Sequence, residues 1–183
     1  MDSGCPFEGF TAYVVELIER TASSDSDIQR DAITTLENLS LNSLRDFVYA
    51  LSTILLTDGI DVRYLMAASL YLGGILSSNH RYTRTDFKDQ WNRLGVDVLD
   101  AVKGALLRAL MLDCQDTRDN AAETLARLAK VESIERRLEL LNNLGTFLTS
   151  EEYKGTPELG ALRCLTEIFK GNTRFPNKDQ LLP

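Results

Sequence analysis

The chain has 183 residues, of which 44% are hydrophobic, 26% charged and 8% aromatic. This apolar content is near the globular average, which excludes a disordered chain, and 11 Gly without a Gly-x-y period exclude a collagen-like fibre. The 20 basic against 27 acidic residues give a net charge of −7, the wrong sign for a protein that binds nucleic-acid phosphates. The length predicts about one globular domain.

The cysteines and the N-terminus indicate the compartment. Cys5, Cys114 and Cys164 are few, odd in number and far apart, which fits neither a disulfide framework nor a zinc site. Residues 1–4 carry no positively charged region or cleavage site. The most apolar stretch, 64–76, is shorter than the ~20 residues of a bilayer span. We therefore expect an intracellular protein without a membrane span.

Helical periodicity recurs along the first half of the chain, whereas the alternating pattern of strands is nearly absent. Asn42 or Ser43 is placed to cap the third helix, and Asp61 to cap the fourth. A shorter helix over 85–94 carries Trp91 and ends this half. The predicted apolar stripes are Phe10, Val14, Leu17 and Ile18; Ile28, Ala32, Leu36 and Leu39; Leu44, Phe47, Val48, Leu51 and Leu55; and Leu65, Ser69, Leu72 and Leu76.

The second half repeats this pattern. Thr156 is placed to cap the last helix, with Pro157 at its first position, and Gly171 closes it. Residues 172–183 are polar and are predicted to be a tail or a truncated connection. The other starts and stripes are Asp97 with Leu99, Val102, Leu106, Ala109 and Leu110; Asp116 with Ala121, Ala122, Leu125, Leu128 and Ala129; and Ser133 with Ile134, Leu138, Leu141, Gly145 and Leu148.

Short connections make successive helices antiparallel neighbours. Pairs then begin near Phe7, Asn42, Asp97 and Ser133, with a spacing of about 35–37 residues in each half, typical of helical-hairpin repeats. One helix of each pair is rich in large apolar residues, and the next is richer in Ala, Gly and Ser, which lets pairs stack closely. The sequence predicts an all-α fold, an α-solenoid over 1–171 of about four pairs plus one extra short helix. A four-helix bundle is the less favoured alternative, because bundles use fewer and longer helices.

Catalytic motifs are scarce. The single histidine, His80, lies in a polar link. The sequence contains no G-x-S-x-G motif with a nucleophilic serine that this histidine could activate. Neither a phosphate-binding loop nor a calcium loop occurs, and acidic pairs such as Glu151 and Glu152 lie at helix ends, where the helix dipole favours acids. We expect no enzyme, no cofactor and no metal. Gly73-Gly74 is predicted to mark tight helix packing or a kink.

A solenoid binds partners mainly through its concave face, which is lined by the second helix of each pair. Residues outside the apolar stripes of these helices are therefore candidates for partner binding, and Arg and Tyr are favoured because interfaces are enriched in them. A solvated surface role is the alternative for each one. The candidates are Gln29, Arg30, Glu37, Arg63, Tyr71, Arg118, Asn120, Glu123 and Arg127.

Several segments occur in an order and spacing known from one family. The segment 66–72 (Met-Ala-Ala-Ser-Leu-Tyr-Leu) is followed by Asp89-Gln90-Trp91, then by Val102-Lys103 and the segment 106–110 (Leu-Leu-Arg-Ala-Leu). This arrangement resembles the N-terminal HEAT repeats of the importin-β (karyopherin-β) family, including the short interposed helix. Weaker matches extend the resemblance over most of 10–169. It implies an α-solenoid of HEAT-type helical hairpins.

The resemblance also implies a function. N-terminal repeats of this family grip the small GTPase Ran in its GTP form with their inner helices, whereas other regions hold cargo, importin-α or nucleoporin Phe-Gly motifs. The chain is thus expected to be a segment, or a short relative, of a receptor for nuclear protein import that moves between cytoplasm and nucleus. Gly73-Gly74, Asn79 and Gln90 depart from basic residues common in the family, which should slow association with an acidic-faced partner. A HEAT or armadillo scaffold subunit unrelated to Ran is the alternative function.

Overall fold

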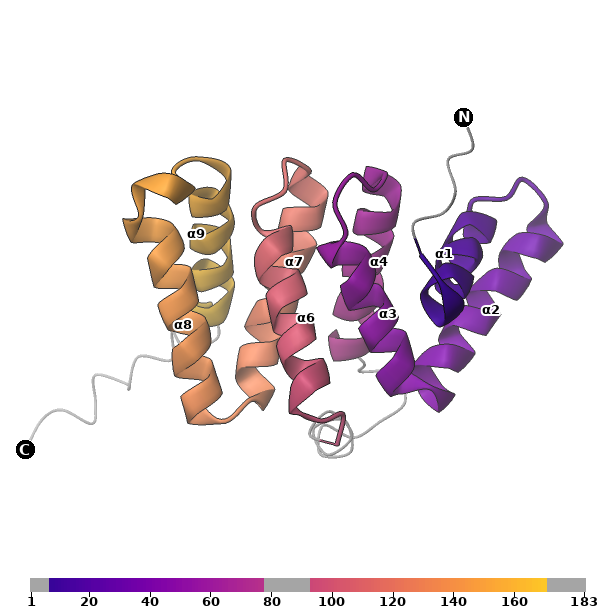
Figure 1. Ribbon diagram of the computed structural model, residues 1–183, viewed down its shortest axis with the longest axis horizontal. Helices are drawn as coiled ribbons and strands as arrows, with labels where there is room; N and C mark the ends of the chain where they lie inside the picture. The colour runs from indigo at the N-terminus through magenta and orange to yellow at the C-terminus, as the bar shows by residue number, and fades with distance from the viewer. Residues whose placement is uncertain (1–6, 78–92, 171–183) are drawn as a thin grey trace, which may run out of the picture.

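The computed structural model describes residues 7–77 and 93–170, which contain eight α-helices and a short 3-10 helix (Figure 1). No strand occurs in these two ranges. The elements are α1 (Gly9–Thr21), α2 (Ser26–Asn42), α3 (Leu44–Leu56), α4 (Val62–Ser77), α6 (Val96–Ala109), α7 (Gln115–Val131), α8 (Ile134–Thr149), η1 (Glu151–Tyr153) and α9 (Thr156–Phe169).

The helices form four hairpins that stand side by side along the long axis of the molecule (Figure 1). The hairpins are α1–α2, α3–α4, α6–α7 and α8–α9, and the two helices of each pack on one another. In the first row, α3 lies between α1 and α6, whereas in the second row α7 lies between α4 and α9. This arrangement confirms the predicted all-α solenoid of stacked hairpins. We call α2, α4, α7 and α9 the second row.

Two predicted caps are confirmed, because their side chains satisfy amide groups that have no partner inside the helix. The carboxylate of Asp61 accepts a hydrogen bond from the Arg63 amide at 2.9 Å, and the hydroxyl of Ser133 accepts one from the Arg136 amide at 3.4 Å. Asp25, which was not among the predicted caps, caps α2 in the same way.

Of the other predicted starts, one makes no capping hydrogen bond and three lie inside the first turn of their helices. Ser43 lies at the cap position of α3, but its side chain makes no capping hydrogen bond. Asp97 and Asp116 lie inside the first turns of α6 and α7, where a negative charge still interacts favourably with the helix dipole. Thr156 is the first residue of α9 and not its cap, because Gly155 at φ 98° makes the turn into the helix.

Most residues of the predicted stripes lie in the core, with four exceptions among those described. Phe10 of α1 is 37% exposed, Ile28 of α2 is 40% exposed, and Ile134 and Leu138 of α8 are 69% and 56% exposed. In α8 the buried residues are instead Leu140 and Leu144, one turn apart. The predicted stripe was wrong for Ile134 and Leu138, whereas Leu141 and Leu148 are partly buried against the core. Apolar residues cover more than one face of α8, and contact with α9 selects the face that is buried.

Several predictions lie outside the described residues: the short helix over 85–94 with Trp91, the link with Asn79 and His80, and the segment from Gly171 onward. Of the cysteines within the described ranges, Cys164 is fully buried, as expected for a small apolar residue, and burial raises the pKa of its thiol to about 12. Cys114 is half-buried.

Candidate protein-binding surface on the second row

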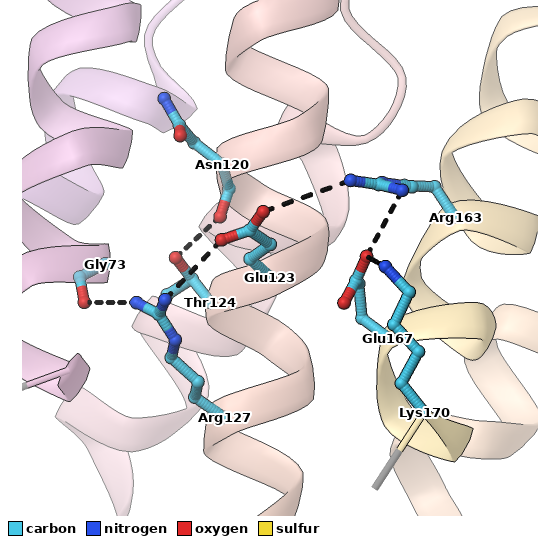
Figure 2. Close-up of polar contacts among 8 residues, drawn as sticks. All are labelled: Gly73, Asn120, Glu123, Thr124, Arg127, Arg163, Glu167 and Lys170. Atoms are coloured by element: carbon cyan, nitrogen blue, oxygen red, sulfur yellow. Dashed lines mark hydrogen bonds and ion pairs between the residues drawn. The ribbon is translucent and has the colours of Figure 1, made fainter.

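A chain of polar contacts crosses the second row from α4 through α7 to α9 (Figure 2). Arg127 of α7 donates a hydrogen bond to the backbone carbonyl of Gly73 in α4 at 3.0 Å. Its other terminal nitrogen lies 3.5 Å from the carboxylate of Glu123, one turn earlier on α7. The guanidinium therefore places a positive charge near the C-terminal end of α4, where the helix dipole favours it.

The same chain of contacts continues to α9. Arg163 lies 3.9 Å from Glu123 on α7 and 3.2 Å from Glu167 on its own helix (Figure 2). It also lies 3.5 Å from Asp119 on α7. Glu167 in turn accepts a hydrogen bond from Lys170 at 2.5 Å, which lowers the pKa of its carboxyl group. We call Gly73, Asp119, Glu123, Arg127, Arg163 and Glu167 the interhelical ladder.

The backbones of α4 and α7 approach closely at Gly73, where the interhelical ladder begins. A Cβ atom built on Gly73 would lie 2.9 Å from the Thr124 hydroxyl oxygen, closer than ordinary side-chain contacts. That hydroxyl is fixed because it donates to the carbonyl of Asn120 at 2.6 Å. Nothing lies within 4 Å of the corresponding position at Gly74. The tight packing predicted for Gly73-Gly74 is therefore confirmed for Gly73.

The candidates of the first two hairpins make local contacts. Arg30 pairs with Asp27 at 2.5 Å within α2, and Arg63 pairs with Asp61 at 2.8 Å at the start of α4. Gln29 donates to the carbonyl of Thr21 at 2.9 Å, which ties α2 to the end of α1. In each case the contact stays within one hairpin.

Glu37 of α2 lies near enough to Tyr71 of α4 to act electrostatically on its phenol. The Tyr71 ring is half-buried and packs edge-on against Phe47, with the ring centres 6.2 Å apart. Burial raises the pKa of Tyr71, and the negative charge of Glu37 raises it further. Glu37 itself is exposed, so this pair offers an aromatic ring and a carboxylate to a partner.

Arg118 lies at the edge of an open depression between α7 and α9. Its guanidinium donates to the carbonyl of Leu112 at 2.6 Å, so it also fixes the link from α6 to α7. The depression is lined by Gln115, Arg118, Asp119, Leu159, Gly160 and Arg163.

The structure thus brings three of the predicted residues together, Asn120, Glu123 and Arg127, and leaves the others spread along the row. Arg163 and Glu167, the α9 members of the ladder, were not among the predicted residues. A signal for them exists, because they are spaced i,i+4 on the second helix of the fourth hairpin, as Glu123 and Arg127 are on that of the third.

Metal-binding clusters and membrane-spanning helices were also sought among the described residues. Within 7–77 and 93–170, no three His, Cys, Asp or Glu side chains lie close enough together to hold a metal ion. None of the helices in these ranges is both long and apolar enough to cross a bilayer.

Sequence comparison finds the family that the chain resembles. The chain is 23% identical over 119 residues to importin subunit beta-1 of Arabidopsis thaliana and 24% identical over 117 residues to that of Schizosaccharomyces pombe. These matches cover 65% and 64% of the chain but only 14% of either relative, so the chain spans a small part of their length. No family model matches the chain.

Solved structures agree on the fold. The Kap95:Nup1 complex matches 86% of the chain and 19% of its own length, with a TM-score of 0.75 and 22% identity. Importin beta crystallised in ammonium sulfate matches 85% and 18%, with a TM-score of 0.72 and 16% identity. A structure of Kap95p bound to RanGDP matches 88% and 24%, with a TM-score of 0.66 and 19% identity. The chain is therefore similar in sequence to importin subunit beta-1 and has the HEAT-type solenoid fold of importin-β structures.

Proposed function

We propose that this chain is a segment of an importin-β-type nuclear transport receptor and that it binds the GTPase Ran through its second row. The observation that carries the proposal is the agreement of two comparisons: sequence and fold both lead to importin β, over most of this chain. A binding role also suits a stack of hairpins whose polar side chains line one row.

We divide the candidates into two groups according to their contacts. Arg30, Glu37, Arg63 and Tyr71 lie on α2 and α4, and their charged members are exposed and paired at most locally. An exposed local ion pair contributes about 0 to 1 kcal/mol to stability, so these side chains can exchange it for a partner at little cost. We assign them to the contact with Ran. Glu123 and Arg127 instead join helices and hold the row in position.

The resemblance supports the remaining parts of the proposal. Movement between cytoplasm and nucleus, nucleoporin binding and cargo binding are properties expected of a whole receptor. Since the chain spans only a small part of its relatives, cargo contacts are assigned to regions other than the second row described here.

The test is titration calorimetry of the chain with Ran loaded with a non-hydrolysable GTP analogue or with GDP. We expect tighter binding of the GTP form. Binding of the GDP form at lower affinity is compatible, since the Kap95p structure contains RanGDP whose switch loops adopt the GTP-bound conformation. Equal binding of both forms, or none, would contradict the proposal and leave a HEAT scaffold unrelated to Ran.

A charge reversal locates the surface. Arg63→Glu should weaken binding of GTP-form Ran about tenfold, mainly through slower association, because it reverses a charge on the proposed contact face. Lys154→Glu is the matched control: it makes the same change in net charge at an exposed site between η1 and α9. Equal losses from both variants would assign the effect to net charge and contradict a contact at Arg63.

A further inference from the structure

The link between the third and fourth hairpins contains a buried carboxylate without a hydrogen bond. Glu132 follows the last residue of α7, and its side chain is 2% exposed. Neither of its carboxylate oxygens has a hydrogen-bond partner. A buried charge in this situation is costly, because the energy of its lost hydration is not replaced.

A lysine from the neighbouring hairpin faces this carboxylate. The ammonium group of Lys103, in α6, lies 3.7 Å from Glu132, too far for a hydrogen bond, and its side chain is 4% exposed. It donates a hydrogen bond instead to Glu139 of α8, at 3.0 Å. Lys103 therefore keeps a hydrogen-bonded carboxylate partner even when Glu132 carries no charge.

The other charged groups near Glu132 come from α8. Arg136 and Glu139 both act on it, with opposite signs, and Arg136 is itself paired with Asp100 of α6 at 2.5 Å. On α7, Lys130 interacts with Glu167 of α9. Burial outweighs the nearby positive charges and raises the pKa of Glu132 above its ordinary range.

The two rows differ at this junction. In the second row α7 and α9 pack closely, whereas in the first row polar pairs join α6 to α8: Lys103 with Glu139, and Arg136 with Asp100. Separation of these polar pairs would leave the fourth hairpin joined to the third mainly through the α7–α9 contact. Glu132 lies in the link between these two hairpins.

We propose that Glu132 is a proton-dependent clasp between the third and fourth hairpins, closed when its carboxyl group is neutral and loosened when it is ionised. Since the folded junction holds a proton that the unfolded chain releases, its stability is greatest while Glu132 is protonated and falls as the pH rises through its raised pKa. The proposal does not depend on Ran binding.

Thermal unfolding of the full chain between about pH 5 and about pH 8 tests it. Glu132→Gln mimics the neutral acid and should raise the Tm near pH 8 by about 2 to 4 °C, a gain that shrinks toward pH 5. His80 is common to both proteins, so subtraction removes its contribution. The readout is how the Tm difference between the variant and the wild type changes with pH. A packing defect of the glutamine amide would shift this difference by a similar amount at every pH, so it would not hide the result. A difference that does not change with pH would overturn the proposal.

Glu135→Gln is the matched control, because Glu135 is an exposed carboxylate in the first turn of α8. Hydrogen bonds from its own amide and from Ser133 lower the pKa of Glu135, so its neutral substitute should lower the Tm near pH 8. A change of opposite sign is thus expected three residues away. A gain equal to that of Glu132→Gln would overturn the assignment.

Hydrogen exchange locates the effect. Near pH 8, Glu132→Gln should slow amide exchange in α8 about threefold to tenfold and leave α3 unchanged. Equal slowing in α3 and α8 would show a global stabilisation and overturn a local clasp.

Discussion

The two halves of the second row use the same residue types in different ways. In α2 and α4, arginines pair with aspartates of their own helix or its cap, as Arg30 does with Asp27. In α7 and α9, arginines reach across to the next helix, as Arg127 does to Gly73. The difference follows from helix spacing: α7 packs closely on both α4 and α9, whereas α2 and α4 hardly touch. A surface arginine is thus available for binding where neighbouring helices stand apart, and structural where they touch.

The largest effect predicted here is at Gly73, where α4 and α7 approach closely. Gly73→Ala would force its new methyl group against the fixed Thr124 hydroxyl, so we expect a loss of about 1 to 3 kcal/mol in the free energy of unfolding. Gly74→Ala, one residue on and in open space, should instead add about 0.5 to 1 kcal/mol. Urea unfolding of the two variants and the wild type measures both changes in the free energy of unfolding. A gain from both would contradict close packing at Gly73.

The next effect concerns the ladder itself. Arg127→Met keeps most of the side-chain length but removes the hydrogen bond to Gly73 and the pair with Glu123, so a loss of about 1 kcal/mol is expected. Arg30→Met removes only a pair within α2 and should change stability by less than about 0.5 kcal/mol. Both free energies are measured by urea unfolding. Equal losses from Arg127→Met and Arg30→Met would contradict the claim that arginines are structural in α7 but not in α2.

In the first half of the chain, a side-chain hydrogen bond also links two hairpins. The Tyr64 hydroxyl of α4 donates a short hydrogen bond to Glu19 of α1, and this contact raises the pKa of Tyr64 to about 12. Because the neutral phenol is favoured in the folded state, its contribution is present below the ordinary tyrosine pKa of about 10 and lost above about 12.

Tyr64→Phe should remove that part of the pH dependence. The difference in Tm between the two proteins should be constant near neutral pH and shrink above about pH 10. Tyr49→Phe, at an exposed site on α3, is the control and should show no such change. A Tm difference between the wild type and Tyr64→Phe that stays constant above about pH 10 would contradict the hydrogen bond.

Local features of this fold could be predicted from the sequence. Asp61 and Ser133 cap the helices that follow them because a cap involves only neighbouring residues. The stripe of α6 was also predictable, since one face of it carries nearly all the apolar residues. In α8, by contrast, apolar residues on two faces left the buried one undetermined until α9 was placed.

The ladder could not be predicted from the sequence, because it depends on distances between hairpins. Arg127 and Gly73 are 54 residues apart, and nothing local distinguishes Arg127 from Arg30. The candidate residues lie on α2, α4 and α7, and their pattern in the sequence does not say which arginines are held by a neighbouring helix. The buried pair of Lys103 and Glu132 was missed for the same reason.

Hydrogen exchange in the presence of Ran tests the central claim most directly. With saturating Ran bound to a GTP analogue, we expect slower amide exchange in α2 and α4 and no change in the first-row helices α3 and α6. Protection confined to the first row, or absent throughout, would contradict the claim that the second row is the binding face.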